Sequence, residues 1–173
     1  MTMTNASLTL SYVVHVVSAA FWTGSVLYAA YSVFPTARAG DLSAAAFERH
    51  VDGLLQVTRW TGLALPVTGA YQLWVRYPLP RLIGTTAGHL VLGMLVLWGV
   101  MNGLLELGVY RMLTAGREPL GVGSYMAEGF VLGAGRDVDV KRLADVGWPY
   151  VRVAVVLAVL LLVDAALLAG GLV

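Results

Sequence analysis

The chain has 173 residues, of which 58% are hydrophobic and 12% are charged, and its mean hydropathy is +0.77. Soluble domains carry roughly 25% charged residues, so this composition is typical of an integral membrane protein and excludes an ordinary soluble domain. The absence of cysteine excludes disulfides, thiolate-bound metals and thiol catalysis, and the net charge of +1 provides no basic surface for nucleic acid.

Four apolar runs are long enough for the helix of about 20 residues that crosses a bilayer. The first run is expected to end at Pro35, because proline disrupts a continuing helix. The predicted spans are residues 8–34, 54–75, 86–110 and 148–172. No run shows the period-2 alternation of barrel strands. The sequence therefore predicts an all-α fold, a single transmembrane domain built as an up-down-up-down four-helix bundle.

The segments between the spans carry their own signals. Ser43 is the expected N-cap of a helix that continues from the first loop into the second span. Residues 113–147 form the one sizeable loop, in which a short helix at the membrane surface is expected. Two glycine pairs have the GxxxG spacing that predicts close helix packing: Gly84 with Gly88, and Gly99 with Gly103.

The distribution of basic residues predicts the orientation. Cytoplasmic loops carry an excess of lysine and arginine. The first and third loops hold seven such residues, Arg38, Arg49, Arg111, Arg117, Arg136, Lys141 and Arg142, whereas the other side holds only Arg76 and Arg81. We therefore expect these two loops in the cytoplasm and both termini outside, in a multi-pass protein of the cell membrane.

Ionisable side chains at membrane depth are costly, so each one is a functional hypothesis. His15 lies about seven residues into the first span and His89 three to five residues into the third, which runs in the same direction. Both are expected roughly 5–10 Å below the outer surface. Asp164, about eight residues before the end of the fourth span, is expected roughly 12 Å from that surface. The three side chains are thus predicted to share one layer.

Two imidazoles at one depth suit a b-type haem, which bundles hold between facing helices. Ala19 and Gly93 each lie four residues after a histidine, where a small side chain would let a porphyrin lie against the backbone. Asp164 is expected to orient a ligand imidazole or to take part in proton movement. The simpler interpretation treats each histidine as a hydrogen-bonded packing residue.

Arg59, Arg152 and Glu106 are predicted near the cytoplasmic ends of their spans. Snorkelling to the headgroups is the simpler interpretation for the arginines. The alternatives are a pairing of Glu106 with an arginine, or two arginines that hold a haem propionate. His50, just before the second span, is expected in the interface and is a poor partner for the other histidines.

Copper is the rival metal, because Met94 and Met101 lie in the third span and thioethers are soft ligands. The chain contains no hydrolase triad, phosphate-binding loop or H-E-x-x-H element. It shows no inverted repeat of the kind that secondary transporters carry. Whether the protein is an enzyme is left open by the sequence.

The segment His15-Val-Val-Ser-Ala-Ala-Phe-Trp-Thr-Gly-Ser resembles the first-span signature of the CopD-like membrane domain, with Ser25 in place of its second glycine. The segment Arg59-Trp-Thr-Gly-Leu-Ala-Leu-Pro-Val-Thr-Gly-Ala-Tyr resembles the second span of that family, and the third span with Asn102 its third. The resemblance covers about residues 8–112. It implies a four-helix or larger bundle linked to copper uptake.

The same segments are similar to the HemJ-type membrane proteins, b-haem proteins associated with protoporphyrinogen oxidation, whose first-span histidine matches His15. Many relatives carry a lysine near the position of His89, so the resemblance favours a second axial ligand here and argues against HemJ-type catalysis. We therefore expect a small b-type cytochrome whose haem is held by His15 and His89 and exchanges electrons with quinone or a redox partner protein. A CopD-type copper permease and a HemJ-type oxidase are the alternatives, and a homo-oligomer is left open.

Overall fold

The computed structural model describes residues 3–115, 121–132 and 138–171, and these ranges contain helices and no strands. The predicted all-α fold is therefore confirmed. Arg117 and Arg136, which the orientation argument uses, lie outside the described residues. The elements are α1 (Met3–Tyr28), the π-helical η1 (Ala29–Val33), α2 (Phe34–Ala39), α3 (Ala44–Arg76), α4 (Leu79–Gly84), α5 (Thr86–Thr114), α6 (Val122–Glu128) and α7 (Val140–Ala169).

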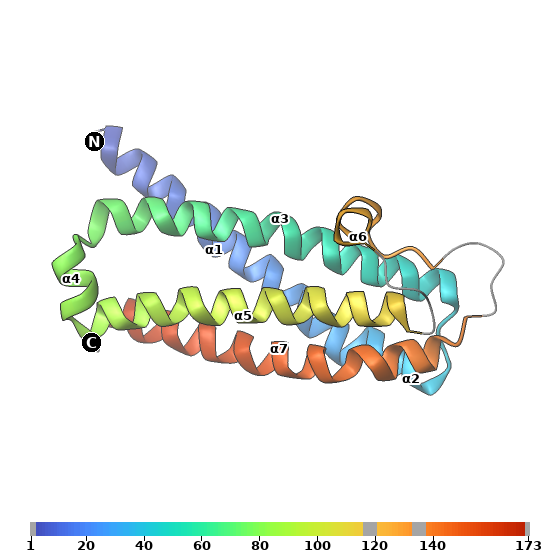
Figure 1. Ribbon diagram of the computed structural model, residues 1–173. Helices are drawn as coiled ribbons and strands as arrows, with labels where there is room; N and C mark the ends of the chain where they lie inside the picture. The colour runs from blue at the N-terminus through green and yellow to red at the C-terminus, as the bar shows by residue number, and fades with distance from the viewer. Residues whose placement is uncertain (1–2, 116–120, 133–137, 172–173) are drawn as a thin grey trace.

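The long helices α3, α5 and α7 run lengthwise beside one another, and α1 crosses them obliquely (Figure 1). The most extensive contacts join α1 to α3 and α5 to α7, and α2 packs against α7. We call the end with α2 and α6 the α2 end, and the end where α4 links α3 to α5 the α4 end. Both labelled chain ends lie toward the α4 end in Figure 1.

Three helical stretches are long and apolar enough to cross a membrane, as judged by length and composition over the described residues. They are Asn5–Ala39, Thr86–Thr114 and Val140–Ala169. The remaining long helix, α3, has 33 residues but is less apolar, because it carries Arg59, Gln72 and several threonines and glycines. The structure thus supports a helical membrane protein, and α3 as a fourth span stays a prediction.

The first helix does not end at Pro35, contrary to expectation. It continues through η1 and α2 to Ala39. Proline lacks an N–H and crowds the carbonyl four residues earlier, and the wider π-helical turn before Pro35 accommodates both effects. The helix ends where Gly40 adopts φ +85°, a left-handed conformation that glycine takes without strain.

Two local predictions are confirmed and one boundary is wrong. The Ser43 hydroxyl accepts a hydrogen bond from the Ala46 amide at 3.3 Å and caps α3. The loop after α5 contains the short helix α6, and the position of this helix at the membrane surface stays a prediction. However, α7 begins at Val140, eight residues before the predicted start, because the Asp139 carboxylate caps it by accepting from the amide of Arg142 at 3.0 Å. The loop is therefore shorter than residues 113–147.

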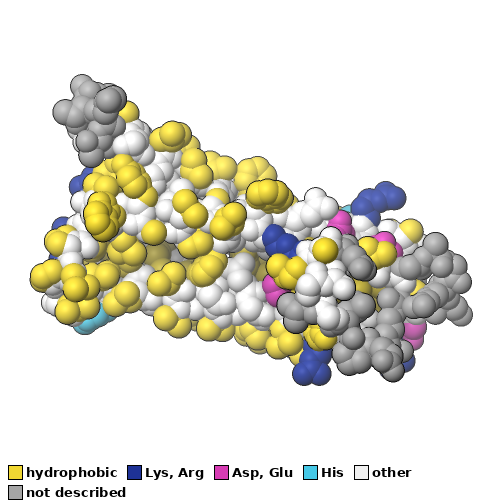
Figure 2. Space-filling model, turned by 45° about the horizontal axis from the view of Figure 1, so that its top comes forward, with side chains coloured by type: hydrophobic (Ala, Val, Ile, Leu, Met, Phe, Trp, Pro, Cys, Tyr) yellow, Lys and Arg dark blue, Asp and Glu magenta, His cyan; other side chains and the backbone are white. Residues whose placement is uncertain are grey.

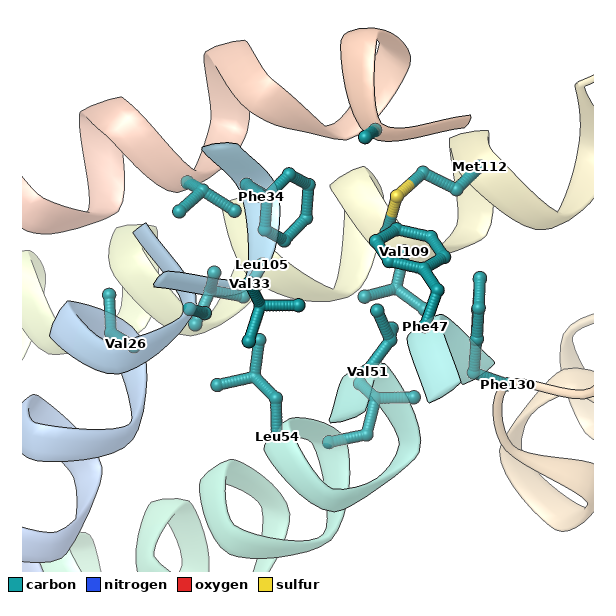
Figure 3. Close-up of a cluster of buried hydrophobic side chains, with 14 of the residues drawn as sticks. Val26, Val33, Phe34, Phe47, Val51, Leu54, Leu105, Val109, Met112 and Phe130 are labelled. Carbon is teal, nitrogen blue, oxygen red and sulfur yellow. The ribbon is translucent and has the colours of Figure 1, made fainter. Parts of the chain in front are cut away.

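The apolar core is concentrated at the α2 end. Phe47 lies at its centre, with ring centroids 5.8 Å from Phe34 and 6.0 Å from Phe130, both in edge-to-face geometry. Figure 3 shows side chains from α1, α3, α5 and the α6 segment meeting around this ring. The labelled members are Val26, Val33, Phe34, Phe47, Val51, Leu54, Leu105, Val109, Met112 and Phe130.

The α4 end is packed differently. The buried side chains of this half are few, and most are small or polar: Leu8, Ser11, Ser18, Leu65 and Asp164. Figure 2 shows this half hollowed between two rows of hydrophobic side chains, whereas charged side chains gather mainly around the α6 region. The bundle is therefore dense at the α2 end and loosely filled at the α4 end.

Of the four glycines that were predicted to mark close helix packing, only Gly88 lies in a close contact. The other close contacts occur at different glycines. A Cβ at Gly108 would lie 2.7 Å from Cβ of Tyr150, so α5 and α7 lie close together there. Among the four predicted glycines, a Cβ at Gly88 would collide with the backbone of α4, and the other three, Gly84, Gly99 and Gly103, have nothing within 4 Å. The GxxxG prediction is wrong for the second pair, because that face of α5 is exposed.

We predict that Gly108→Ala destabilises the protein by about 1–3 kcal/mol, because the added methyl group overpacks against Tyr150. The matched variant Gly103→Ala has open space and should be neutral or stabilising by up to about 1 kcal/mol, since alanine favours helix. Thermal unfolding of the detergent-solubilised protein measures both. Equal stability of the two variants would show that α5 and α7 do not touch at Gly108.

Candidate functional site

His15 is turned toward α3 in the loosely packed half. Its Nδ1 lies 2.8 Å from the hydroxyl oxygen of Thr68, and its Cε1 would lie 3.5 Å from a Cβ placed on Gly69. The residue belongs to a polar stripe on α1 whose members recur every three or four residues and face α3 or the bundle interior: Ser11, His15, Ser18 and Trp22. Ser11 extends this contact, because its hydroxyl donates to the Thr68 carbonyl at 3.2 Å.

The hydrogen bonds around Thr68 determine the tautomer of His15. The Thr68 hydroxyl has one hydrogen, which it donates to helix carbonyls, at 2.7 Å from the oxygen of Ala64 and 3.1 Å from that of Leu65. Toward His15 it therefore accepts, and His15 Nδ1–H donates. A neutral ring protonated at Nδ1 carries its lone pair on Nε2.

One layer of contacts relates the depths of the helices. The Trp22 indole N–H donates to Oδ1 of Asn102 at 3.2 Å, and this oxygen would lie 3.0 Å from a Cβ on Gly62. His15 is seven residues from Trp22 along α1. At about 1.5 Å per residue, it lies about 10 Å from this layer, toward the α4 end. Thr68, six residues from Gly62, lies about 9 Å along in the same direction.

His89 does not share the depth of His15. Its distance of thirteen residues from Asn102 puts it about 20 Å from the same layer, roughly 10 Å beyond His15. The ring is exposed, and its Nε2 lies 2.9 Å from the carbonyl oxygen of Ile83 in α4. A carbonyl only accepts, so Nε2–H donates and is not free to bind a metal. The expected equal depth of the two histidines is therefore wrong, and the structure does not bring them together.

Asp164 does lie near the level of His15. Its Oδ2 would be 3.7 Å from a Cβ on Gly93, which is about 14 Å from the Asn102 layer. The side chain is 8% exposed, and its Oδ1 is buried without a hydrogen-bond partner among the described residues. Gly93 thus accommodates the carboxylate from α7, while Ala19 on α1 is half-buried.

Arg59 takes part in an ion-pair network rather than only reaching toward headgroups. Its Nε and one terminal nitrogen donate to the two carboxylate oxygens of Glu106 at 2.8 and 3.0 Å. The guanidinium lies 5.1 Å from the ring of Tyr125 in α6, and the Tyr125 hydroxyl donates to the same carboxylate. Burial and the Glu106 carboxylate raise the pKa of Tyr125. The predicted pairing of Glu106 with an arginine is confirmed.

Arg152 and His50 lie apart from these groups. Arg152 is exposed on α7, with its guanidinium 6.0 Å from the ring of Trp148, and it does not pair with Arg59. His50 is half-buried and packs edge-to-face on Tyr28 at 5.8 Å. The alternative in which Arg59 and Arg152 hold one propionate gains no support, because Arg59 already binds Glu106.

Sequence reasoning missed Thr68 and Trp98. The indole N–H of Trp98, four residues before Asn102 on α5, is buried and has no hydrogen-bond partner in the part of the chain that the structure describes. A signal for Thr68 was present, since Thr68 stands directly before Gly69, the glycine that the His15 ring approaches. Buried polar atoms without partners are rare, so Trp98 and Asp164 mark the loosely filled half as unusual.

The described residues contain no group of three or more His, Cys, Asp or Glu side chains that would hold a metal ion. A haem iron takes only one or two protein ligands, so this finding leaves a haem untested. Comparison of the chain with protein-family models, curated proteins and solved structures finds no match in any of the three. The resemblance to CopD-like and HemJ-type proteins stays a prediction.

We predict that Tyr125→Phe lowers the free energy of unfolding by about 1–2 kcal/mol, because the Glu106 carboxylate loses a donor. The raised pKa of Tyr125 makes this contribution depend on pH. Above about pH 10 the unfolded chain releases the proton that the folded protein keeps, so stability falls as pH rises.

Thermal unfolding at about pH 8 and about pH 11 measures both effects. The control is Tyr31→Phe, since Tyr31 is 76% exposed. A Tyr125→Phe variant that matches wild type at the lower pH would contradict the network, and wild type and variant that lose equal stability at the higher pH would contradict the pKa shift.

Proposed function

We propose that this chain is a four-span membrane protein of the cell membrane that binds one b-type haem between α1 and α5, with His15 as an iron ligand. The observation that carries the proposal is the hydrogen bond from His15 Nδ1 to Thr68. Metal-binding histidines donate one ring N–H to a second residue, which orients the ring and leaves the other nitrogen for the metal. His15 meets this requirement with its Nε2.

The loose packing around His15 supports the same proposal. The side chains buried in this half are mostly small or polar, so a flat group would displace fewer bulky side chains there than at the dense α2 end. Ala19 follows His15 by one turn and presents only a methyl group. A bound haem would supply one-electron redox chemistry, and the chain contributes the oriented imidazole of His15, small neighbouring side chains and the carboxylate of Asp164 as a proton-binding group.

The membrane topology belongs to the proposal as well. With α3 as the fourth span, the helices alternate in direction, and the excess of basic residues at the α2 end assigns that end to the cytoplasm. Both termini and the α4 end then face outward, so His15 lies in the outer half. Electron transfer with quinone or an outer redox partner fits this position, and the resemblance to CopD-like and HemJ-type bundles agrees with it.

The second axial position has two candidates on α5. His89 reaches it only in a conformation that breaks the hydrogen bond to Ile83. Met94 is half-buried and lies eight residues from Asn102, about 12 Å, close to the level of His15. Methionine is an established haem ligand and raises the reduction potential. Met101, by contrast, is 2% exposed and belongs to the apolar core, which leaves the copper alternative with one methionine fewer.

Visible spectra of the purified protein, reduced minus oxidised, test the proposal together with metal analysis. We expect a sharp b-type α-band and about one iron per chain. His15→Ala should lose the haem or most of its occupancy. His89→Ala and Met94→Leu should both keep the haem. The spin state should change only in the variant that removes the second axial ligand.

His50→Ala is the matched control, since His50 packs on Tyr28 far from the level of His15. The spectrum of this variant should equal that of wild type. Copper without iron would contradict the haem and favour the copper alternative. A haem with an unchanged spectrum in His15→Ala would contradict the ligand assignment.

A further inference from the structure

A shallow pocket of about 300 Å³ opens on the outer surface of α7. Its lining comes from about two turns of that helix and consists of Pro149, Arg152, Val153 and Val156. The two valines are 46% and 58% exposed. The pocket therefore combines an apolar wall with one cationic side chain, on a helix that is long and apolar enough to cross a membrane.

Arg152 has no anionic partner among the described residues. The ion pairs there join other residues, and Arg152 contacts only the ring of Trp148, at 6.0 Å. Arg38 provides a useful contrast, because it also lies over Trp148, at 5.2 Å, but donates to the Asp145 carboxylate at 2.6 Å. One of the two guanidiniums beside this tryptophan is thus neutralised, and the other is not.

The position of Arg152 along the chain defines its surroundings. It is the only lysine or arginine between residues 143 and 173, and a long apolar stretch follows it. Trp148, one turn earlier, is the type of residue that marks the boundary between headgroups and hydrocarbon. Lys141 and Arg142 lie further toward the α2 end and are exposed. An exposed guanidinium at this boundary faces lipid phosphates, and the valines beyond it face acyl chains.

We propose that this pocket binds one anionic phospholipid, whose phosphate pairs with Arg152 while an acyl chain lies against Val153 and Val156. Guanidinium groups bind phosphate oxygens through two parallel hydrogen bonds, and Trp148 holds the arginine in place for this contact. The site is independent of the proposed haem. Tyr150 lies opposite Gly108, which relates the level of α7 to that of α5. On this basis Arg152 lies about 16 Å from His15 along the bundle, so the two sites do not overlap.

The test compares protein in nanodiscs of phosphatidylglycerol with protein in nanodiscs of phosphatidylcholine, and native mass spectrometry counts the lipids retained after release. We expect one retained phosphatidylglycerol per chain and a higher unfolding temperature in the anionic nanodisc. Arg152→Ala should weaken retention about fivefold, which corresponds to about 1 kcal/mol for one basic residue at an anionic surface. Val156→Trp fills the apolar wall and should reduce retention while it keeps the charge.

Arg142→Ala is the matched control, because Arg142 is exposed at the same end of α7 but does not line the pocket. It should retain the lipid as wild type does. Equal loss in Arg142→Ala and Arg152→Ala would overturn the site in favour of a general charge effect. Unchanged retention in Arg152→Ala and Val156→Trp, or displacement of the lipid by inorganic phosphate alone, would overturn it as well.

Discussion

The hydrogen bond from the Trp22 indole to the Asn102 amide joins α1 to α5 across the bundle, at the level where the apolar core stops. Gly62 of α3 comes so close to the same amide oxygen that a Cβ there would lie 3.0 Å away. Three helices thus converge on one polar atom. In an apolar environment, breaking this contact leaves a polar group unsatisfied, so the layer holds the helices in register.

The two halves of the bundle follow from that layer. Toward the α2 end, aromatic and branched side chains interdigitate around Phe47. Toward the α4 end, α3 supplies the polar partners. The Thr68 hydroxyl accepts from His15, and Gln72 donates to the backbone and hydroxyl oxygens of Ser11 at 3.3 and 3.2 Å. These partners explain why α3 is the least apolar of the long helices. Because its polar side chains bond within the protein, its composition is compatible with membrane depth.

The sequence predicted the existence and type of the long helices, because apolar runs of this length have few other folds. The start of α5 at Thr86 and the cap at Ser43 depend on local chemistry and were also predictable. The continuation of the first helix through Pro35 was not predictable, because it needs a π-helical turn, which amino-acid composition does not indicate. The predicted depth of His89 was wrong for another reason. Counting residues from the span ends assumes that all helices start at the same depth, whereas side-chain contacts such as that of Trp22 with Asn102 determine the register.

We propose that His15 presents its Nε2 to a haem iron in the loosely filled half. Replacing His15 with glycine and adding free imidazole tests it most directly, because the small ligand enters the space that the side chain leaves. The account predicts that His15→Gly lacks the haem spectrum and regains it when imidazole is added during reconstitution with haem. A His15→Gly protein that is folded and binds haem with the wild-type spectrum in the absence of imidazole would contradict it.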